Sequence, residues 1–438
     1  MPALKSKPKT GLGQKLKGVK KQEQGPLWKG PEDDGPLGGV TQSMLNNFLG
    51  CRHRHYVKYI LGLQPVSGFS RVLEFGSMWH LAEEAHAKEP AGTKASNRWQ
   101  GELTIYAQGL CKKYPLAQDE INKWYLVILT TFPLYMDWWS RHKDVIQRTP
   151  LLQEETFHVP YTLPSGRIVW LKGMFDSVDL IGKGKDAGIW LKENKTKSEI
   201  DEARLGRQLK FDLQTCLYLC ALEAAGYDDS KGTWTGGLNK LTSGKRIPIK
   251  GVIYNVVRRP LSGGRGSITQ REGSDGSVCG GCEGKGERTM YAGTKRETFE
   301  KPCSRCEGRG RTGAKPPETA EEFQERLRGI IESAVGQEWG MPDGQHFFFQ
   351  RWTVAITPTD VERFKTRFLN PLLEELCDWY EWVTGGDPWR DGNKLHHQLP
   401  FGMYNSLVEN GFSDLDEFLM DGNDAGLVRK TTLFEELA

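Results

Sequence analysis

Two acidic side chains and a lysine stand within apolar segments of the sequence, in a pattern that could hold a metal ion. Glu193 and Lys195 lie two residues apart in AGIWLKENKTKS, a segment that opens like a buried strand. Residues two apart on a strand point to the same face, so the acid and the base face the same way. Asp176 lies in the preceding apolar segment, LKGMFDSVDL. Burying such charges is costly unless they pair with each other or bind a metal.

The chemistry that this group could perform depends on whether the charges only neutralise each other. A Glu193–Lys195 ion pair is the simplest explanation, but it does not account for Asp176. Two carboxylates on neighbouring strands, with a lysine beside them, suit a hard divalent cation such as Mg²⁺. Such an ion lowers the pKa of a bound water and stabilises charge that develops on a phosphate. The lysine can then hold the attacking water or help to deprotonate it.

The elements around these residues alternate between helices and strands. Helical spacing of apolar residues predicts helices at 41–63, from about 75, over 98–147, and at about 207–225, 319–335 and 357–383. Short apolar runs between turn residues predict strands at 154–163, 167–181, 187–198, 249–259 and 346–356. This order predicts an α/β core with a helical front section.

The strand residues resemble the core motif of the PD-(D/E)XK nuclease superfamily. In that motif an Asp on one strand is followed by Asp/Glu-x-Lys on the next, as in Asp176, Glu193 and Lys195. GMFDSVD further resembles the Gly-x-x-Asp strand of the RecB-like exonuclease domains within the superfamily, which include the AddB and CRISPR-associated types. LKENKTKS resembles their Asp/Glu-x-Lys-Thr strand.

Helical segments carry further motifs that resemble the same domains. FGSMWH places Gly76 four residues before His80, as in their Gly-x-x-x-His motif. DLQTCLY resembles their Gln-x-x-x-Tyr helix, with Gln214 and Tyr218 on one helix face. The opening segment FLGCRHRHYVKYILGL resembles their N-terminal Cys-x-x-x-Tyr segment. The resemblance covers about residues 41–258.

The resemblance implies an α/β fold with a restriction-endonuclease-like core, in which a central mixed sheet is flanked by helices. It also implies that Asp176, Glu193 and His80 bind Mg²⁺ or Mn²⁺, with the backbone carbonyl of Asn194 as a further ligand. Lys195 would position the nucleophilic water. These roles would make the chain a hydrolase that acts on phosphodiester bonds.

Other residues near the motifs receive weaker assignments. The resemblance implies that Gln214 and Tyr218 border the site and contact the DNA strand. Glu154 or Glu155, on the preceding strand, could add an acidic group, although glutamates at strand edges are common. We expect Asp179 to be a solvated or capping acid, because its odd spacing from Asp176 puts it on the opposite face of the strand.

Four of the nine cysteines form two Cys-x-x-Cys pairs within a Gly-, Ser- and Arg-rich stretch. Two such pairs in one short segment predict a zinc site rather than disulfides. The pairs continue as CGGCEGKG and CSRCEGRG and resemble the repeated motif of the DnaJ-type zinc domain. That domain uses four motifs for two zinc ions, so two motifs imply one structural Zn²⁺. The expected ligands are Cys279, Cys282, Cys303 and Cys306.

An iron–sulfur cluster is the competing metal assignment. Some RecB-like nucleases hold one with a cysteine at the position of Cys51 and three near the C-terminus. Here the C-terminal region NKLHHQLPFGMYNSLVENGF has no cysteine, which disfavours a cluster. We expect Cys51 to be a core residue or a relic, Cys377 to be isolated, and Cys216 and Cys220 to pack in the interior.

Composition and charge set the broad class of the protein. With 37% hydrophobic and 26% charged residues, the chain fits a soluble globular protein. It has no apolar run of membrane-spanning length, and the N-terminus lacks the apolar region of a secretory signal. We therefore expect a cytoplasmic protein, in a bacterium or in the host of a phage. The expected segments are a basic disordered arm at 1–40, the nuclease core at 41–260, an inserted zinc module at 261–316, and helices and a strand at 317–438 that complete the nuclease domain.

Basic residues are concentrated in two places. The first 21 residues contain seven lysines and no acid, which is typical of a solvated tail or of an arm that contacts phosphates. The zinc module is also flanked by basic residues that suit phosphate contact or a protein partner: Arg258, Arg259, Arg265, Lys285, Lys295, Arg296, Lys301, Arg305, Arg309 and Arg311. We predict DNA contacts for Arg258 and Arg259.

These patterns together predict a metal-dependent deoxyribonuclease, most simply an exonuclease in DNA recombination, repair or phage DNA metabolism. The expected partner is DNA, with a recombinase, a single-strand-binding protein or a helicase as candidate protein partners and no membrane. The alternative is a non-catalytic DNA-binding scaffold of a recombination complex. A third hypothesis is a zinc-dependent protein-interaction factor without affinity for DNA. The sequence has no Gly-x-x-x-x-Gly-Lys-Ser/Thr motif, so any ATP-driven unwinding requires a partner.

Overall fold

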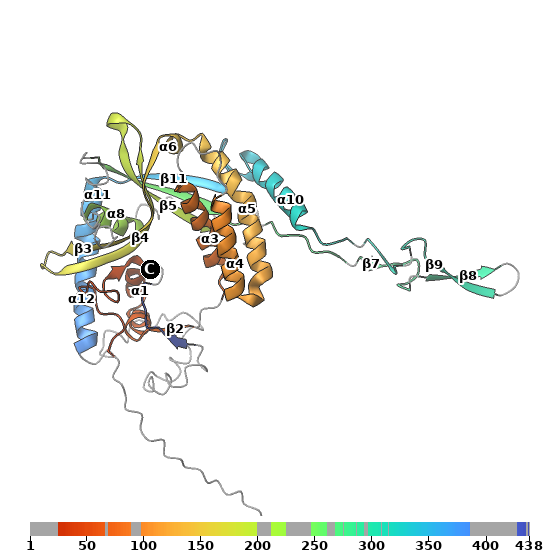
Figure 1. Ribbon diagram of the computed structural model, residues 1–438, viewed down its shortest axis with the longest axis horizontal. Coiled ribbons are helices and arrows are strands. Elements are labelled where there is room, and N and C mark those ends of the chain that lie inside the picture. The colour runs from red at the N-terminus through yellow and green to blue at the C-terminus, as the bar shows by residue number, and fades with distance from the viewer. Residues whose placement is uncertain are drawn as a thin grey trace, which may run out of the picture.

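In the computed structural model, a central mixed sheet is covered by helices, and a long arm projects from the body (Figure 1). The described residues are 25–65, 69–88, 98–198, 212–224, 247–260, 268–274, 276–285, 287–292, 297–307, 309–313, 315–385, 427–434 and 437. The basic stretch at 1–21 and three of the expected phosphate-binding residues, Arg265, Lys295 and Arg296, lie outside them.

Six strands form the central sheet, in the order β1–β4–β5–β6–β11 with β3 paired to β4. β4 runs antiparallel to β3 and β5, β5 runs parallel to β6, and β11 is antiparallel to β6. Their bounds are β1 Val40–Thr41, β3 Arg148–Thr162, β4 Ile168–Ile181, β5 Gly188–Lys197, β6 Ile249–Arg258 and β11 Phe349–Ala355. A mixed sheet flanked by helices confirms the expected α/β fold.

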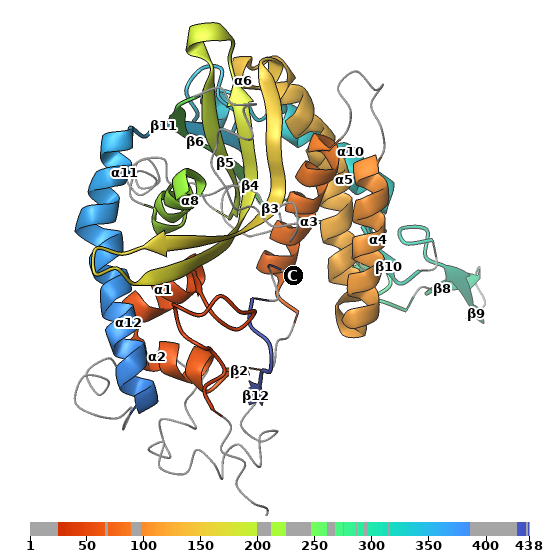
Figure 2. The same cartoon turned by 60° about the vertical axis from the view of Figure 1, so that its left-hand side comes forward.

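Helices cover both faces of this sheet (Figure 2). The Lys195 ammonium contacts Gln214 of α8 (Leu213–Ala224), whereas the Lys192 ammonium contacts Glu83 of α3 (Arg71–Ala87). Residues 192 and 195 are an odd number apart on β5, so their side chains point to opposite faces. Helices α3 and α8 therefore lie on opposite faces of β5.

Each face has its own hydrophobic core. The strands and α8 form one core together with α1 (Gln42–Gly50) and α12 (Asn370–Gly385). The other core joins α3 to α4 (Arg98–Lys113), α5 (Gln118–Ser140) and α10 (Ala320–Ser333). Shorter elements complete the described fold: α2 Arg52–His55, β2 Leu63–Pro65, α6 Lys143–Ile146, α11 Pro358–Phe364 and β12 Leu427–Arg429. The predicted helix at 357–383 is interrupted by a π-helical turn at Lys365–Leu369.

Residues 25–39, within the stretch expected to form the basic arm, belong to the fold. The Trp28 side chain is fully buried and its indole N–H donates to the Gly39 carbonyl at 2.8 Å. Its ring also packs edge-on against Tyr380 of α12, with ring centroids 5.0 Å apart. Ordered structure therefore extends to residues 25–39.

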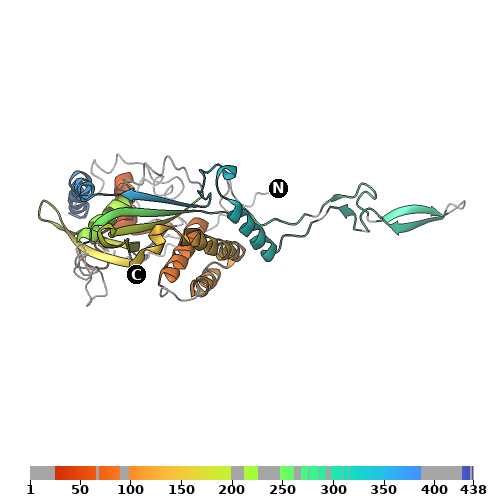
Figure 3. The ribbon, with the colours of Figure 1, turned by 90° about the horizontal axis from the view of Figure 1, so that it is seen from above.

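The segment expected to be a zinc module, at 261–316, lies between β6 and α10, and its described residues project from the body (Figure 3). This projection is called the arm below. Part-way along it, β7 (Ser277–Val278) pairs with β10 (Arg311–Thr312). Further out, β8 (Glu287–Ala292) pairs with β9 (Glu297–Pro302). The segment thus leaves the body after β6 and returns to it at α10.

None of the helices within the described residues has the length and apolar character needed to cross a membrane.

The buried His55 makes stability depend on pH. Its imidazole has no exposed surface, is enclosed by Trp28, Phe48 and Trp379, and has a pKa that burial lowers to about 3. Below pH 6.5 the unfolded chain binds a proton that the folded chain does not, so stability falls as pH falls. We expect the change from pH 6 to pH 5 to cost about 1.2 kcal/mol of stability through this residue.

Urea unfolding at several pH values tests this expectation. His55→Gln should reduce the slope of unfolding free energy against pH in this interval by about one proton. An unchanged slope in the variant would show that His55 does not titrate as its burial requires.

Candidate active site and zinc site

The pairing of β4 with β5 stops at the predicted acidic residues. The last paired residues are Ser177 and Lys192, and the next positions along the two strands are Asp176 and Glu193. There the Asp176 carboxylate accepts the backbone N–H of Asn194 at 2.8 Å. A side chain thus takes a backbone donor at the point where the strands part.

On the α8 face, Glu193 and Lys195 form the pair that their spacing predicts. The Lys195 ammonium donates to Glu193 Oε2 at 2.8 Å and to the Gln214 side-chain oxygen at 2.9 Å. Glu193 has no exposed surface, and its Oε1 has no hydrogen-bond partner among the described residues. The ion pair therefore supplies a hydrogen-bond partner to only one of the two carboxylate oxygens of Glu193.

On the other side of Asp176 lies a second acid with a histidine. His80 Nδ1 lies 3.2 Å from Glu154 Oε1 and 3.7 Å from Asp176 Oδ2. One ligand atom from each of these three residues falls within 4.8 Å of the other two. This geometry brings His80 of α3 to the acids of the sheet.

The backbone explains why Glu154, and not Glu155, joins the group. Glu154 has a φ of +46°, a left-handed conformation that is rare for residues with side chains. Its neighbour Glu155 pairs regularly with Phe175, while Glu154 interrupts the ladder opposite Asp176. The sequence left the choice open, because a single reversed φ cannot be seen in a strand pattern.

The electrostatics of the group favour positive charge. Burial raises the pKa of Glu193, and the Asp176 carboxylate raises it further, to about 7. Burial also raises the pKa of Glu154 to about 7. Burial lowers the pKa of His80, but Asp176 and Glu154 outweigh it and raise that pKa to about 9. A proton on His80 thus partly neutralises the negative charge of the neighbouring carboxylates. A bound divalent cation would neutralise more of that charge.

Tyr218, expected to contact DNA, lies mainly in the interior. Its ring is 7% exposed and packs edge-on against Phe157 and Phe175. A Cβ added at Gly173 would lie 2.5 Å from the Phe157 ring and 2.9 Å from the Tyr218 ring. The glycine of the Gly-x-x-Asp motif is thus required because the tyrosine of the helix motif fills its space. These contacts hold α8 against the strand that carries Asp176.

The other assigned residues are also buried. Arg258 and Arg259 are each 7% exposed, and their guanidinium groups donate to the carbonyls of Ser198 and Thr196. Their role in DNA binding stays a prediction, whereas these contacts fix the end of β5. Asp179 is 1% exposed and binds Arg148 at 2.7 Å, so the expectation of a solvated or capping acid is wrong. Its partner, Arg148, lies on β3, and the apolar pattern of the strand around Asp179 gives no sign of this pairing.

The donor set suits a hard divalent cation. Asp176 and Glu193 offer carboxylate oxygens, one of which is buried without a partner, and His80 offers a ring nitrogen. Mg²⁺ and Mn²⁺ prefer such oxygen-rich sets with few protein ligands. The residues present therefore fit the ion, and Glu154 stands where it could bind it or orient His80.

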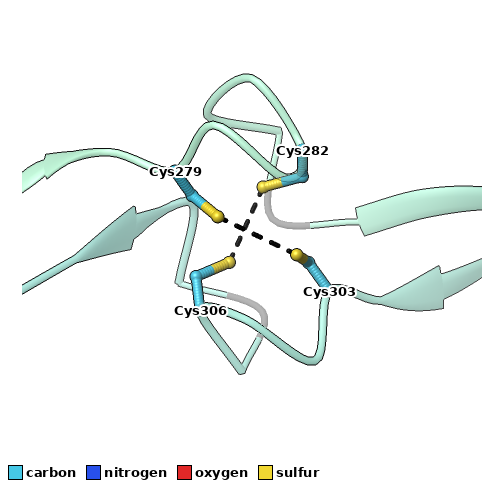
Figure 4. A group of neighbouring side chains, drawn as sticks. All are labelled: Cys279, Cys282, Cys303 and Cys306. Carbon is cyan, nitrogen blue, oxygen red and sulfur yellow. Dashed lines mark hydrogen bonds between the residues drawn. The ribbon is translucent and has the colours of Figure 1, made fainter.

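The four cysteines of the arm converge on one point (Figure 4). The Sγ atoms of Cys279 and Cys303 are 3.9 Å apart, and those of Cys282 and Cys306 are 3.6 Å apart. Disulfides would need about 2.05 Å. Tetrahedral zinc with Zn–S bonds of about 2.3 Å places its sulfurs roughly 3.8 Å apart, so the cluster is compatible with zinc.

The two cysteine turns repeat each other. In each, the second cysteine N–H donates to the first cysteine carbonyl at 3.2 Å. The following residues, Glu283 and Glu307, both have a φ of +53°. The repeated sequence Cys-x-x-Cys-Glu-Gly thus gives two turns of the same backbone shape. Each turn contributes two thiols to the cluster.

A comparison with known protein families gives one match. The family described as the PD-(D/E)XK nuclease superfamily matches residues 40–346, more than half of the 438-residue chain. The matched range runs from β1 to just before β11 and includes all four residues of the strand and α3 motifs, His80, Asp176, Glu193 and Lys195. No curated protein matches this chain.

The place where β4 and β5 part, next to Asp176 and Glu193, is called the strand gap below. Metal binding there can be measured without any reaction. We expect calorimetric titration to show Mn²⁺ binding to the wild type, no detectable binding to Asp176→Asn, and at least roughly tenfold weaker binding to Glu154→Gln. Glu155→Gln is the matched control, because Glu155 keeps its regular strand pairing. Equal affinity in Asp176→Asn and the wild type would place the ion elsewhere.

Zinc in the arm is a separate expectation. Elemental analysis should find about one zinc per chain, and Cys282→Ser should lose it. The buried side chains of this cluster are the four cysteines themselves, so metal loss should expose the arm to proteases. Thermal unfolding of the sheet should change little. Cys111→Ser, on α4, should retain zinc; a zinc-free wild type would contradict the assignment.

Proposed function

The chain belongs to the PD-(D/E)XK nuclease superfamily, and on this premise we propose that it is a metal-dependent DNA exonuclease. It hydrolyses phosphodiester bonds from a DNA end, in recombination, repair or phage DNA metabolism. The observation that carries the proposal is the strand gap that gathers Asp176, Glu193 and Lys195.

In this proposal Asp176, Glu193 and His80 hold the catalytic Mg²⁺ or Mn²⁺, together with the Asn194 carbonyl. When bound, the ion supplies Lewis-acid stabilisation of the phosphate and a more acidic water. Asn194 fits this role because its N–H already binds Asp176, which orients the adjoining peptide toward the gap. Glu154 holds one ring nitrogen of His80 and so fixes the orientation of the imidazole.

Lys195 is suited to hold the attacking water. An ammonium group has three N–H donors, and two of them are used by Glu193 and Gln214. The third has no acceptor within the part of the chain that the structure describes, so it can bind a water or a phosphate oxygen. Burial opposes the charged form, but Glu193 and Asp176 raise the pKa of Lys195 above its usual value. The lysine is therefore a cation that orients and stabilises, with Gln214 as its positioning residue.

The preference for an exonuclease rests on the helix motifs. The Gly-x-x-x-His and Gln-x-x-x-Tyr patterns are typical of the RecB-like branch, and their residues contact the acidic strands here. The arm supports DNA binding through exposed basic residues, namely Lys285, Lys301, Arg305, Arg309 and Arg311. Exposed acids, Glu283, Glu287, Glu300 and Glu307, are interspersed with them, so the arm would contribute phosphate contacts locally.

Digestion of end-labelled linear DNA with Mg²⁺ or Mn²⁺ tests the proposal. We expect progressive loss from the ends, with covalently closed circles spared. Lys195→Ala should slow cleavage about 100-fold or more, because it removes the group that positions the nucleophile. Lys197→Ala is the matched control, since Lys197 is exposed on the same strand two residues further on.

The other outcomes redirect the assignment. Cutting of closed circles would make the protein an endonuclease. DNA binding with no cleavage of any substrate would favour the non-catalytic scaffold of a recombination complex. Equal activity of Lys195→Ala and Lys197→Ala would contradict the role given to Lys195.

A further inference from the structure

A cavity of about 490 Å³ lies at the far edge of the sheet from β4, between the end of α5 and the start of β11. Its volume is within the range of small-molecule sites, roughly 300–1,000 Å³. It shares no residue with the strand gap or with the cysteine cluster. The residues that line it are Trp138, Trp139, Arg141, His142, Gly344, Gln345, His346, Phe349, Gln350, Arg351 and Trp352.

The cavity combines aromatic faces with cations. Trp138, Trp139 and Trp352 are each partly exposed. The Arg351 guanidinium stacks on the Trp139 ring at 4.0 Å, while Arg141 is exposed at the rim. The neighbouring acid, Asp144, is bound by Arg351 at 2.6 Å and also contacts His142. The rim therefore keeps positive charge beside flat aromatic surfaces.

Two polar atoms of the cavity residues have no partner among the described residues. Gln350 is 7% exposed, and its Oε1 accepts no hydrogen bond. The indole Nε1 of Trp139 is also buried without an acceptor. Buried polar atoms are almost always hydrogen-bonded. A ligand with both an acceptor and a donor would satisfy these two atoms when the Gln350 and Trp139 side chains turn toward the cavity.

A row of polar side chains joins this cavity to the catalytic strand. Asn194, Asn255 and Arg351 are in register on β5, β6 and β11. Asn255 donates to the Asn194 side chain at 2.9 Å, and Arg351 donates to Asn255 at 2.5 Å. Two strand spacings separate the ends of the row, roughly 10 Å. Asn194 and Asn255 are buried, and they point to the sheet face opposite Glu193 and Lys195. The row therefore links the cavity to β5 through the interior of the protein.

We propose that this cavity binds one nucleotide, with its base against the tryptophans and its phosphate at Arg141. A nucleobase supplies the flat face and the paired donor and acceptor, and base–aromatic stacking contributes about 1–3 kcal/mol. The nucleotide is either part of the DNA strand that the enzyme degrades or a released nucleoside monophosphate. The first source rests on the proposed function; binding itself does not.

Calorimetric titration of the zinc-loaded chain without added Mg²⁺ tests the proposal, with dAMP and a dodecameric oligo(dT) as the two probes. Arg141→Glu and Gln350→Met should each weaken binding about tenfold or more. Arg328→Glu, an exposed arginine of α10 outside the cavity, should bind like the wild type. Thermal melts verify that each variant is folded.

Cavity-dependent binding of dAMP would identify the free nucleotide as the ligand, and cavity-dependent binding of the oligonucleotide alone would identify the DNA strand. Either result supports the site. Binding that both cavity variants leave unchanged, or no binding of either probe, would overturn it. If the chain binds nucleotide through the cavity but cleaves no DNA, only the proposed nuclease activity is refuted. If the chain cleaves DNA but the cavity variants bind nucleotide like the wild type, only the proposed nucleotide site is refuted.

Discussion

The carboxylate of Asp176 accepts the N–H of Asn194 at 2.8 Å, at the place where the ladder between β4 and β5 ends. This contact keeps the two strands apart and aims both acids of the gap at one space. It needs support on both faces, because separated strands expose backbone groups that a sheet would pair. Helix α8 gives that support through Gln214 and Tyr218, and α3 gives it through Glu83 and His80.

In this gap the acidic groups outnumber the basic ones. Two buried carboxylates, Asp176 and Glu193, and the partly buried Glu154 face one lysine and one histidine. Burial, together with the charge of Asp176, raises the pKa of Glu154 and of Glu193 to about 7, while Asp176 and Glu154 raise the pKa of His80 to about 9 against the effect of its burial. Such a site contrasts with the arm, where the buried cluster among the described residues consists of the four cysteines alone. The packed core around it builds the gap, whereas the arm is the part that we expect to depend on a bound metal for its stability.

Much of this arrangement could be predicted from residue spacing. The i, i+2 pair of Glu193 and Lys195 and the two Cys-x-x-Cys turns depend only on local geometry, and both have the contacts that their spacing implies. What sequence reasoning could not give depends on tertiary contacts. The reversed φ of Glu154, the burial of Asp179 by Arg148 and the packing of Trp28 against α12 are set by partners distant in the chain. The burial of Arg258 and Arg259 is of the same kind, since basic residues beside a zinc module are usually exposed.

The central claim is that the gap between β4 and β5 is a divalent-metal site. Anomalous diffraction from crystals soaked in Mn²⁺ tests it most directly, because the signal locates the ion independently of activity. We expect a peak roughly 2.0–2.3 Å from carboxylate oxygens of both Asp176 and Glu193. A peak that contacts neither acid, with none in the gap, would contradict it.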